Sequence, residues 1–278
     1  MTRKILRLYP ALRDDIGDLV TRRPLPGPAL PRLGAFLFLN HHGPQLYPPH
    51  SHGLPFGPHP HRGFETVTFI LDGELAHRDS GGHESIIGPG GVQWMTAGSG
   101  LIHEEVSPED FKRRGGAMEI LQLWVNLPAR LKMTTPRYTG LQAEGFPVVR
   151  ESGAAVQVIA GEYHGQTGPI TSLTGVFMTT VRLTAGGSVR FDWLTGRDVF
   201  LYVVRGAIAI GGVTAAKFHL VTLSDGEAVE IAAEEDSLIL FGHAEPLNEP
   251  VVAHGPFVMN TEAEIHQAIA DYRAGKFG

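Results

Sequence analysis

The sequence predicts an all-β chain that folds as barrels or sandwiches and ends in a single helix. Glycine and proline are frequent, at 35 and 20 of the 278 residues, and they separate short apolar stretches. Such a composition is typical of many strands joined by turns. Turn sequences such as LDGE at 71–74 and SDGE at 224–227 fall between these stretches. Many short strands at close spacing favour a sandwich or a barrel.

Eight segments have the apolar pattern and the length expected of strands. They occur in both halves of the chain. The predicted strands are Glu65–Leu71, Gly91–Thr96, Glu119–Leu127, Ala155–Ala160, Val176–Leu183, Val199–Val204, Ala207–Ile210 and Ser237–Phe241.

Only the C-terminal segment predicts a helix clearly. Thr261 stands three residues before Glu264, which is the spacing of a capping box at a helix start. Gly275 is placed to end the helix. Apolar residues recur between them at helical spacing, at Ile265, Ala268, Ile269 and Tyr272. We therefore expect one face of this helix to pack on a sheet.

The strand pattern is interrupted in NLPARLKMTTPRYTG, at 126–140, where Pro128 and Pro136 disfavour a continuous strand. Because the sequence is β-rich on both sides, two barrel domains are the simplest organisation. We expect an N-terminal domain at 1–135 and a C-terminal domain at 136–278 that ends in the helix. One large sandwich is the alternative, since periodicity alone does not exclude it.

Composition excludes several classes of function. The net charge is −6 and the densest basic cluster is KRR at 112–114, so direct nucleic-acid binding is not expected. There is no cysteine, which excludes disulfides, thiolate nucleophiles and cysteine-based metal sites. The longest strongly apolar stretch, VFLYVV at 199–204, is too short to span a membrane. The N-terminus lacks the pattern of a secretion signal, so a cytoplasmic location is expected.

Two pairs of residues have the spacing of metal ligands on strands. His59 and His61 are two residues apart, as are His103 and Glu105, and side chains two apart on a strand share a face. Three imidazoles and one carboxylate suit a divalent ion such as Fe, Ni, Cu, Zn or Co, and not Ca or Mg.

A composition effect is the alternative explanation for any single pair. Six histidines lie at positions 41 to 61, mostly among prolines, and His50 and His52 form another pair of the same spacing. A further regularity favours the metal site. Gly53, His59, His61 and Glu65 occur in the pattern G-x5-H-x-H-x3-E.

This pattern resembles the first motif of the cupins, and longer segments resemble one cupin family, the pirins. They span nearly the whole chain in the same order. The segments are FGPHPHRGFETVTFILDGELAHRDS (56–80), VQWMTAGSGLIHEE (92–105), LQLWVNLPARLKM (121–133), EPLNEPVVAHGPFVMNT (245–261) and AIADYRAGKFG (268–278).

The resemblance implies a bicupin, which is a chain of two β-barrels with metal in the N-terminal one only. The implied ligands are His59, His61, His103 and Glu105. Iron(II) is the expected metal, with nickel, copper, cobalt, zinc and manganese as alternatives. Several pirins act as quercetin 2,3-dioxygenases, whereas animal pirin is a transcriptional coregulator. The resemblance also implies a monomer.

Some residues depart from the pirin pattern, and the roles of others are not assigned by it. Glu65 is the carboxylate ligand in the wider cupin pattern, but its side chain shares a face with His61 only if the strand continues through Gly63. We prefer Glu105 as ligand and expect Glu65 to be a hydrogen-bond partner of the ligands. Asn40 replaces an aspartate that is usual in pirins, and His41 and His42 have no assigned role. Structural roles are expected for the isolated histidines of the C-terminal half, which are His164, His219, His243, His254 and His266.

Three functions are compatible with this metal site. The first is a dioxygenase that opens flavonol-type aromatic substrates with O2 and releases CO, with Glu105 as base and Phe69, Trp94 and Met95 lining the cavity. The second is a non-catalytic, metal-binding regulatory protein that recognises a protein partner. The third is a closed structural metal site.

Overall fold

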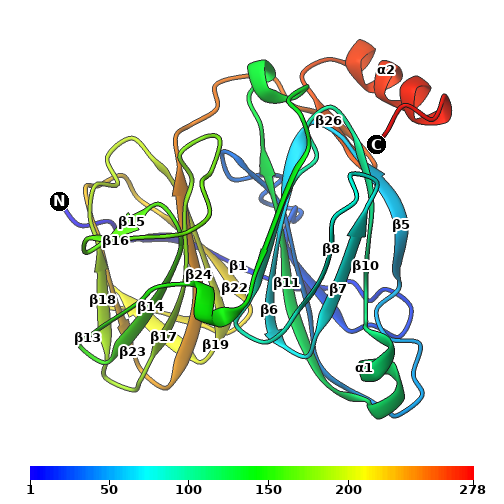
Figure 1. The fold of residues 1–278 in the computed structure, drawn as a ribbon. Coiled ribbons are helices and arrows are strands. Elements are labelled where there is room, and N and C mark those ends of the chain that lie inside the picture. The colour runs from blue at the N-terminus through cyan, green and yellow to red at the C-terminus, as the bar shows by residue number, and fades with distance from the viewer. The chain divides into compact units, whose positions relative to one another are not determined.

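The computed structural model describes residues 1–278 and consists mostly of strands (Figure 1). Its only α-helices are α1 (Glu109–Arg114) and α2 (Glu262–Arg273). Short 3-10 helices occur at Ala129–Leu131 and Ala143–Gly145. The prediction of an all-β chain with a C-terminal helix is therefore confirmed. No helix in the structure has the length and apolar character that crossing a membrane requires.

The chain forms two compact units, and each is assembled from separate segments. Unit 1 contains Met1–Leu12, Arg23–Phe36 and Gly145–Pro246. Unit 2 contains Arg13–Arg22, Leu37–Glu144 and Leu247–Gly278. Each unit thus contains segments from both halves of the chain. A single boundary between residues 135 and 136 does not describe this arrangement. The assignment of 1–135 and 136–278 as separate domains stays a prediction.

Three antiparallel sheets come from the second half of the chain, joined by one N-terminal strand. The largest has the strand order β1 (Ile5–Pro10), β22 (His219–Leu223), β19 (Asp198–Arg205), β24 (Ser237–Ala244), β17 (Phe177–Leu183), β14 (Ala154–Ala160) and β13 (Val148–Glu151). The second has the order β18 (Ser188–Phe191), β23 (Val229–Ala233), β20 (Ala207–Ile210) and β21 (Val213–Ala216). The strands β15 (Glu162–Tyr163) and β16 (Gln166–Thr167) form a separate pair.

Three further sheets come mainly from the first half of the chain. One has the order β12 (Arg137–Leu141), β9 (Val92–Thr96), β6 (Phe64–Asp72), β11 (Gly116–Asn126), β4 (Phe36–Tyr47), β3 (Thr21–Leu25) and β2 (Leu12–Arg13). Another has the order β5 (Phe56–His61), β10 (Leu101–Val106), β7 (Leu75–Asp79) and β8 (Glu84–Ile87). The strands β25 (Val252–His254) and β26 (Phe257–Met259) form a hairpin.

All eight predicted strands are present. They are β6, β9, β11, β14, β17, β19, β20 and β24. The structure extends several of them beyond the apolar run, most of all β11 at its start to Gly116 and β24 at its end to Ala244. Hydrogen bonding to neighbouring strands continues through these less apolar residues, which sequence pattern alone does not reveal.

Alternating side chains build the core of unit 1. Val181 and Leu183 on β17 and Ile239 and Phe241 on β24 face the same apolar cluster. Phe241 stacks on Phe191 with ring centroids 3.9 Å apart. Burial of such aromatic and branched side chains is the main stabilising term for a sheet packed on a sheet.

The predicted C-terminal helix and its capping box are confirmed. The Thr261 side chain accepts a hydrogen bond from the Glu264 backbone amide, and the Glu264 carboxylate accepts one from the Thr261 amide. The helix then buries Ile265 and Ala268 against Phe257 and other residues of the β25–β26 hairpin. The amphipathic pattern therefore attaches α2 to unit 2.

A largely buried ion pair also holds α2 in place. Arg62 Nη1 lies 2.8 Å from Asp271 Oδ2, and the two side chains are only 5% and 12% exposed. Gln267 and Lys276 donate further hydrogen bonds to Asp271. Hydrogen bonds from Arg62, Lys276 and Gln267 lower the pKa of Asp271 below its ordinary value.

We expect Asp271→Asn to weaken the attachment of α2 at neutral pH, because Arg62 loses its buried counterion. The native carboxylate has a lowered pKa, so its stabilising contribution is complete above about pH 4, the ordinary aspartate pKa, and is lost as the pH falls further. Thermal unfolding followed by circular dichroism from pH 7 to pH 2 tests this. The variant should unfold at lower temperature at pH 7 and show a flatter acid dependence.

The matched control for this prediction is Glu262→Gln, which removes an exposed carboxylate from the first turn of the same helix. Equal melting temperatures for Asp271→Asn and Glu262→Gln across the pH range would contradict the assigned role of Asp271.

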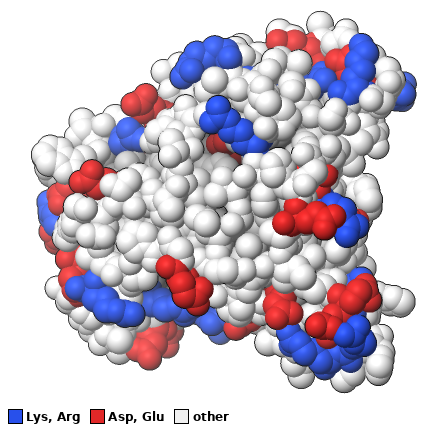
Figure 2. Space-filling model, in the orientation of Figure 1, with Lys and Arg blue, Asp and Glu red and all other residues white.

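Charges of both signs are interspersed on the face of the molecule drawn in Figure 2. Several surface charges of the protein form exposed ion pairs, such as Arg78 with Glu84 at 2.8 Å. Exposed pairs of this kind contribute little to stability.

Candidate metal centre

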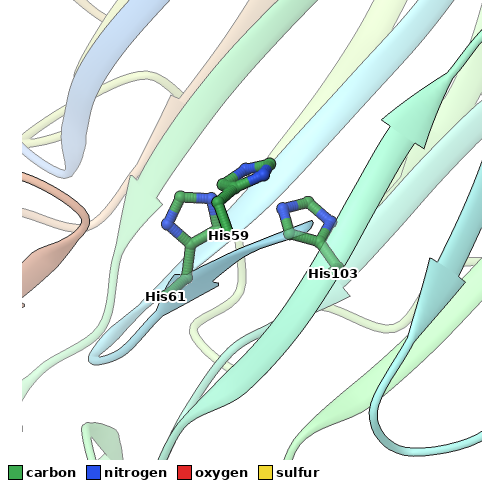
Figure 3. Close-up of side chains that lie close together, drawn as sticks. All are labelled: His59, His61 and His103. Atoms are coloured by element: carbon green, nitrogen blue, oxygen red, sulfur yellow. The ribbon is translucent and has the colours of Figure 1, made fainter. Parts of the chain in front are cut away.

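Two neighbouring strands bring three histidines together. The strands β5 and β10 pair in antiparallel register, with His103 opposite His59 and Leu101 opposite His61. Each of the three side chains offers a ring nitrogen, and these nitrogens all lie within 4.8 Å of one another. Figure 3 shows the three rings converging from the two strands. The predicted shared face of His59 and His61 is thus present in the structure.

Burial and hydrogen bonding leave ring nitrogens of these histidines available. His61 and His103 are 3% and 1% exposed. The Nδ1 of His59 lies 2.8 Å from the Gly57 carbonyl, and the Nδ1 of His61 lies 3.4 Å from the Pro256 carbonyl. Each Nδ1–H therefore donates to the backbone, which leaves Nε2 as the free lone pair. This is the usual arrangement around metal-binding histidines.

His103 supplies the sharpest test of whether a metal fits. Both of its ring nitrogens are buried, and neither has a hydrogen-bond partner. An unsatisfied buried polar atom costs free energy, and a bound cation would remove this cost at one of the two nitrogens. Imidazole nitrogens lie about 2.1 Å from a divalent ion that they share, so two of them are at most about 4.2 Å apart. The ring nitrogens of this group, within 4.8 Å of one another, are close to that spacing.

The protonation states of the histidines agree with metal binding. Burial, together with the nearby His59, lowers the pKa of His61 to about 3. Burial and the neighbouring histidines lower the pKa of His103 well below its ordinary value. Both rings are therefore neutral at physiological pH, and the neutral imidazole is the form that binds a metal.

Glu105 lies on the same strand but is held apart from the three-histidine group. His103 and Glu105 are both buried on β10, whereas Glu104 between them is partly exposed. The Glu105 carboxylate accepts hydrogen bonds from Thr68, at 2.7 Å, and from the Gln122 amide. Its oxygens do not belong to the group of ligand atoms formed by the histidines. Its role as a fourth ligand stays a prediction.

Glu65 does not reach the histidines. Strand β5 ends at His61 and β6 begins at Phe64, and Gly63 between them has φ +87°. This left-handed residue breaks the alternation that would have placed Glu65 on the face of His61. The Glu65 carboxylate instead accepts a hydrogen bond from Thr96 at 2.7 Å, and no hydrogen bond joins it to His59, His61 or His103. Burial raises the pKa of Glu65 to about 6.

Comparison with known proteins accounts for this arrangement. Residues 18–125 match the family model described as Pirin, and residues 178–278 match the Pirin C-terminal cupin domain. Over 248 residues the chain is 41% identical to a putative quercetin 2,3-dioxygenase of Pseudomonas aeruginosa, covering 88% of this chain and 87% of that protein. The chain belongs to the pirin family. The resemblance seen in the sequence and the bicupin fold are thereby confirmed.

Solved structures support the same assignment of this pirin family member. A quercetin 2,3-dioxygenase from Acinetobacter baumannii is 37% identical, with a TM-score of 0.92 over 100% of this chain and 99% of that one. A bacterial pirin from Escherichia coli, solved in complex with nickel(II), has the same fold at 23% identity. Its TM-score is 0.70, over 86% of this chain and 99% of that one.

The residues that surround the candidate centre of this pirin were not predicted from the sequence. Thr68 and Gln122 are directly opposite each other on β6 and β11, and both bond Glu105. Trp124, two residues after Gln122, has its ring 5.4 Å from that of His61. Thr68 and Gln122 are polar residues within apolar strands, which was an indication in the sequence that they have a role in a site. Their contact with each other's strand depends on strand register, which the sequence does not reveal.

The predicted cavity lining is partly wrong. Met95 lies opposite Thr66 on the face that also carries Gln122 and Trp124. Phe69 and Trp94 belong to the other face of the same sheet, because their positions differ by odd numbers of residues from those of Thr68 and Met95. Odd and even positions along each strand predict which residues share a face of the sheet. Only the structure shows which of the two faces carries the candidate centre.

His41 and His42, which had no assigned role, are buried hydrogen-bonding residues. His41 Nε2 lies 2.8 Å from a carboxylate oxygen of Glu119, and both side chains are fully buried. His42 Nδ1 lies 2.8 Å from the Thr21 hydroxyl. Neither belongs to the three-histidine group.

Proposed function

We propose that this protein is a metal-dependent dioxygenase that opens a flavonol-type substrate with O2 and releases CO. The observation that carries the proposal is the three-histidine group, in which His61 and His103 are buried and neutral and both nitrogens of His103 are unpartnered. A carboxylate on the adjoining position of the same strand face supplies a base. The name of the 41% identical relative supports this class of reaction.

The metal would be held by His59, His61 and His103, with Glu105 as fourth ligand. We propose iron(II) as the native ion, with nickel, copper, cobalt, zinc and manganese as further ions that nitrogen and oxygen ligands accept. When bound, the ion supplies a Lewis acid that stabilises negative charge on a substrate oxygen.

Glu105 is the residue that moves the proton. It would accept the proton of the flavonol 3-hydroxyl, which leaves an electron-rich ring that reacts with O2. Hydrogen bonds from Thr68 and Gln122 fix the orientation of the carboxylate. The base is thereby oriented before the substrate arrives, so the activation free energy does not include the entropic cost of ordering its side chain.

Aromatic residues beside the histidines give the centre apolar surroundings. Trp124 lies between Phe38, with ring centroids 4.6 Å apart, and Phe64, at 4.4 Å. On the other side, His77 lies 5.4 Å from His103 and stacks on Tyr138 at 4.0 Å. These rings favour a flat aromatic substrate and reduce the access of water.

The reaction balances without another reductant or oxidant. Both atoms of O2 enter the product, one at each carbon that flanks the carbon bearing the 3-hydroxyl. That central carbon leaves with its own oxygen as CO, and the remaining fragments stay joined as an ester with a free carboxylate. The proton taken by Glu105 returns to the product.

Incubation of metal-loaded protein with quercetin and O2 tests the proposal. We expect one CO released per quercetin consumed, measured by gas chromatography, with loss of the flavonol absorbance. Protein stripped by a chelator should be inactive and should recover on reloading. If CO does not exceed the metal-free control for any of the six ions, the dioxygenase proposal is wrong, and the non-catalytic regulator and the closed structural site are the functions left to test.

A further inference from the structure

One of the cavities lined by residues of unit 1 is rich in aromatic side chains and lies apart from the three-histidine group. Its volume is about 570 Å³, within the range of about 300–1,000 Å³ typical of small-molecule sites. The residues that argue for a ligand are Tyr163, Phe177, Trp193, Arg197 and His243. No metal-ligating group occurs there, because the only such group in the structure is formed by His59, His61 and His103.

Trp193 is the most unusual residue of this cavity. Its side chain is 82% exposed, and its backbone has φ +64°. A bulky residue in the left-handed region is strained, and an exposed indole forgoes the burial that normally stabilises tryptophan. His164, which lines the same cavity, also has a positive φ of 46°. Strain and apolar exposure together indicate a surface shaped for an occupant.

A fixed pair of hydrogen-bond donors lies on another wall. Arg197 Nε donates to His243 Nδ1 at 2.5 Å, and Arg197 Nη2 donates to the Gly175 carbonyl at 2.9 Å. The His243 ring stacks on Phe177, with centroids 4.8 Å apart and planes 15° apart. Because Nδ1 accepts a hydrogen bond, the ring proton is on Nε2, which has no partner in the protein.

Burial, together with the charge of Arg197, keeps His243 in this form. Burial first, and then the nearby Arg197 and Arg3, lower the pKa of His243 to about 3. The ring is therefore neutral at physiological pH and presents one N–H donor. Arg197 carries the positive charge, and its nearest carboxylate is the exposed Glu245, at 3.7 Å.

The other charged side chains of the cavity leave this positive charge in place. Asp192 is paired with Arg190 at 2.8 Å, and Arg190 also contacts Glu230. Glu162 is exposed at the lining. An anionic group is therefore favoured beside Arg197 and His243, and an aromatic body is favoured beside the exposed ring of Trp193.

We propose that this cavity binds a flat aromatic carboxylate, with its ring against Trp193 and its carboxylate on Arg197 and the Nε2–H of His243. The site does not depend on the metal or on the reaction proposed above. Unit 1 thus acts as a ligand-binding module, and His243, for which sequence predicts only a structural role, is part of its recognition surface.

The test uses 1-naphthoate as probe with the metal-free full-length protein. We expect saturable binding in calorimetry and a change of tryptophan emission that disappears in Trp193→Phe, since Trp193 is the most exposed of the three tryptophans. The cation 1-naphthylmethylammonium has a similar shape and should bind at least about tenfold more weakly, because it cannot pair with Arg197.

Variants locate the site. Arg197→Met should weaken naphthoate binding by about tenfold or more, the usual effect of losing a charge-assisted hydrogen bond. Arg197→Lys should retain part of the affinity, which distinguishes loss of charge from loss of folding. The matched control is Arg150→Met, an exposed arginine of the same unit that does not line this cavity, and it should bind as the wild type does.

Three outcomes would overturn the proposal. They are equal binding of the anion and the cation, unchanged affinity in Arg197→Met, and loss of binding in His59→Ala/His61→Ala, which would place the probe at the histidine group instead. Because the last variant disables the metal centre, this experiment separates failure of the aromatic-acid site from failure of the proposed dioxygenase.

Discussion

Substitution of His103 by glutamine is expected to remove the metal from the protein, leaving less than about a tenth of the wild-type occupancy. A single residue near a metal typically changes affinity 10- to 100-fold even when it is not a ligand. His103 is 1% exposed, and both of its nitrogens are unpartnered, so no other side chain replaces it. Elemental analysis of protein purified in one step, after loading with iron(II) or nickel(II) under anaerobic conditions, measures the occupancy.

Two further variants separate this effect from misfolding. His103→Leu replaces the imidazole with an apolar side chain of similar size. This variant should therefore fold but should not bind the metal. His83→Gln changes a histidine whose side chain is 45% exposed and bonded to Asp79, and it should bind metal normally. Full occupancy in His103→Gln would mean that the ion is bound elsewhere, and the candidate centre would be wrong.

Glu105→Gln is expected to lower the turnover of a flavonol by about 10²- to 10⁴-fold, the usual contribution of a positioned base. Glutamine keeps the shape of the side chain and still accepts a hydrogen bond from Thr68, but it cannot accept the substrate proton. The three histidines remain, so most of the metal should be retained. Steady-state CO release, normalised to bound metal, measures the effect.

The neighbouring residue provides the control for this experiment. Glu104 lies on the opposite face of β10, partly exposed, and Arg78 Nη1 is 3.4 Å from its carboxylate. Glu104→Gln should therefore turn over substrate at the wild-type rate. If Glu105→Gln were as active as Glu104→Gln while both retained metal, the proton would have to be taken by another group.

Local sequence pattern predicted most of the secondary structure because the alternation of a strand and the cap of a helix depend on near neighbours. The capping box of Thr261 and Glu264 is an interaction over three residues. The shared face of His59 and His61 follows in the same way from strand geometry. These features required no knowledge of the rest of the chain.

The misplaced expectations depend on the backbone conformation of one residue or on contacts between distant segments. Glu65 lost its expected role because the single residue Gly63 adopts φ +87° between two strands of different sheets. Phe69 and Trp94 lie on the face of the sheet that points away from the histidines. Odd and even positions along a strand define its two faces, but only strand packing identifies the face that carries the histidines. Thr68 and Gln122 meet Glu105 through the pairing of β6 with β11, which no short-range pattern specifies.

The sequence by itself determined the pirin family, the all-β architecture, the capped terminal helix and the spacing within the pairs His59/His61 and His103/Glu105. Each of these depends on residue identity and on spacing along one segment. The tertiary structure decided that the three imidazoles meet, that Glu105 rather than Glu65 lies on the strand beside them, and that α2 joins unit 2. It also decided that Trp193, Arg197 and His243 border one cavity. Such meetings depend on strand register and on the exchange of segments between units, and these are set by the packing of the whole chain.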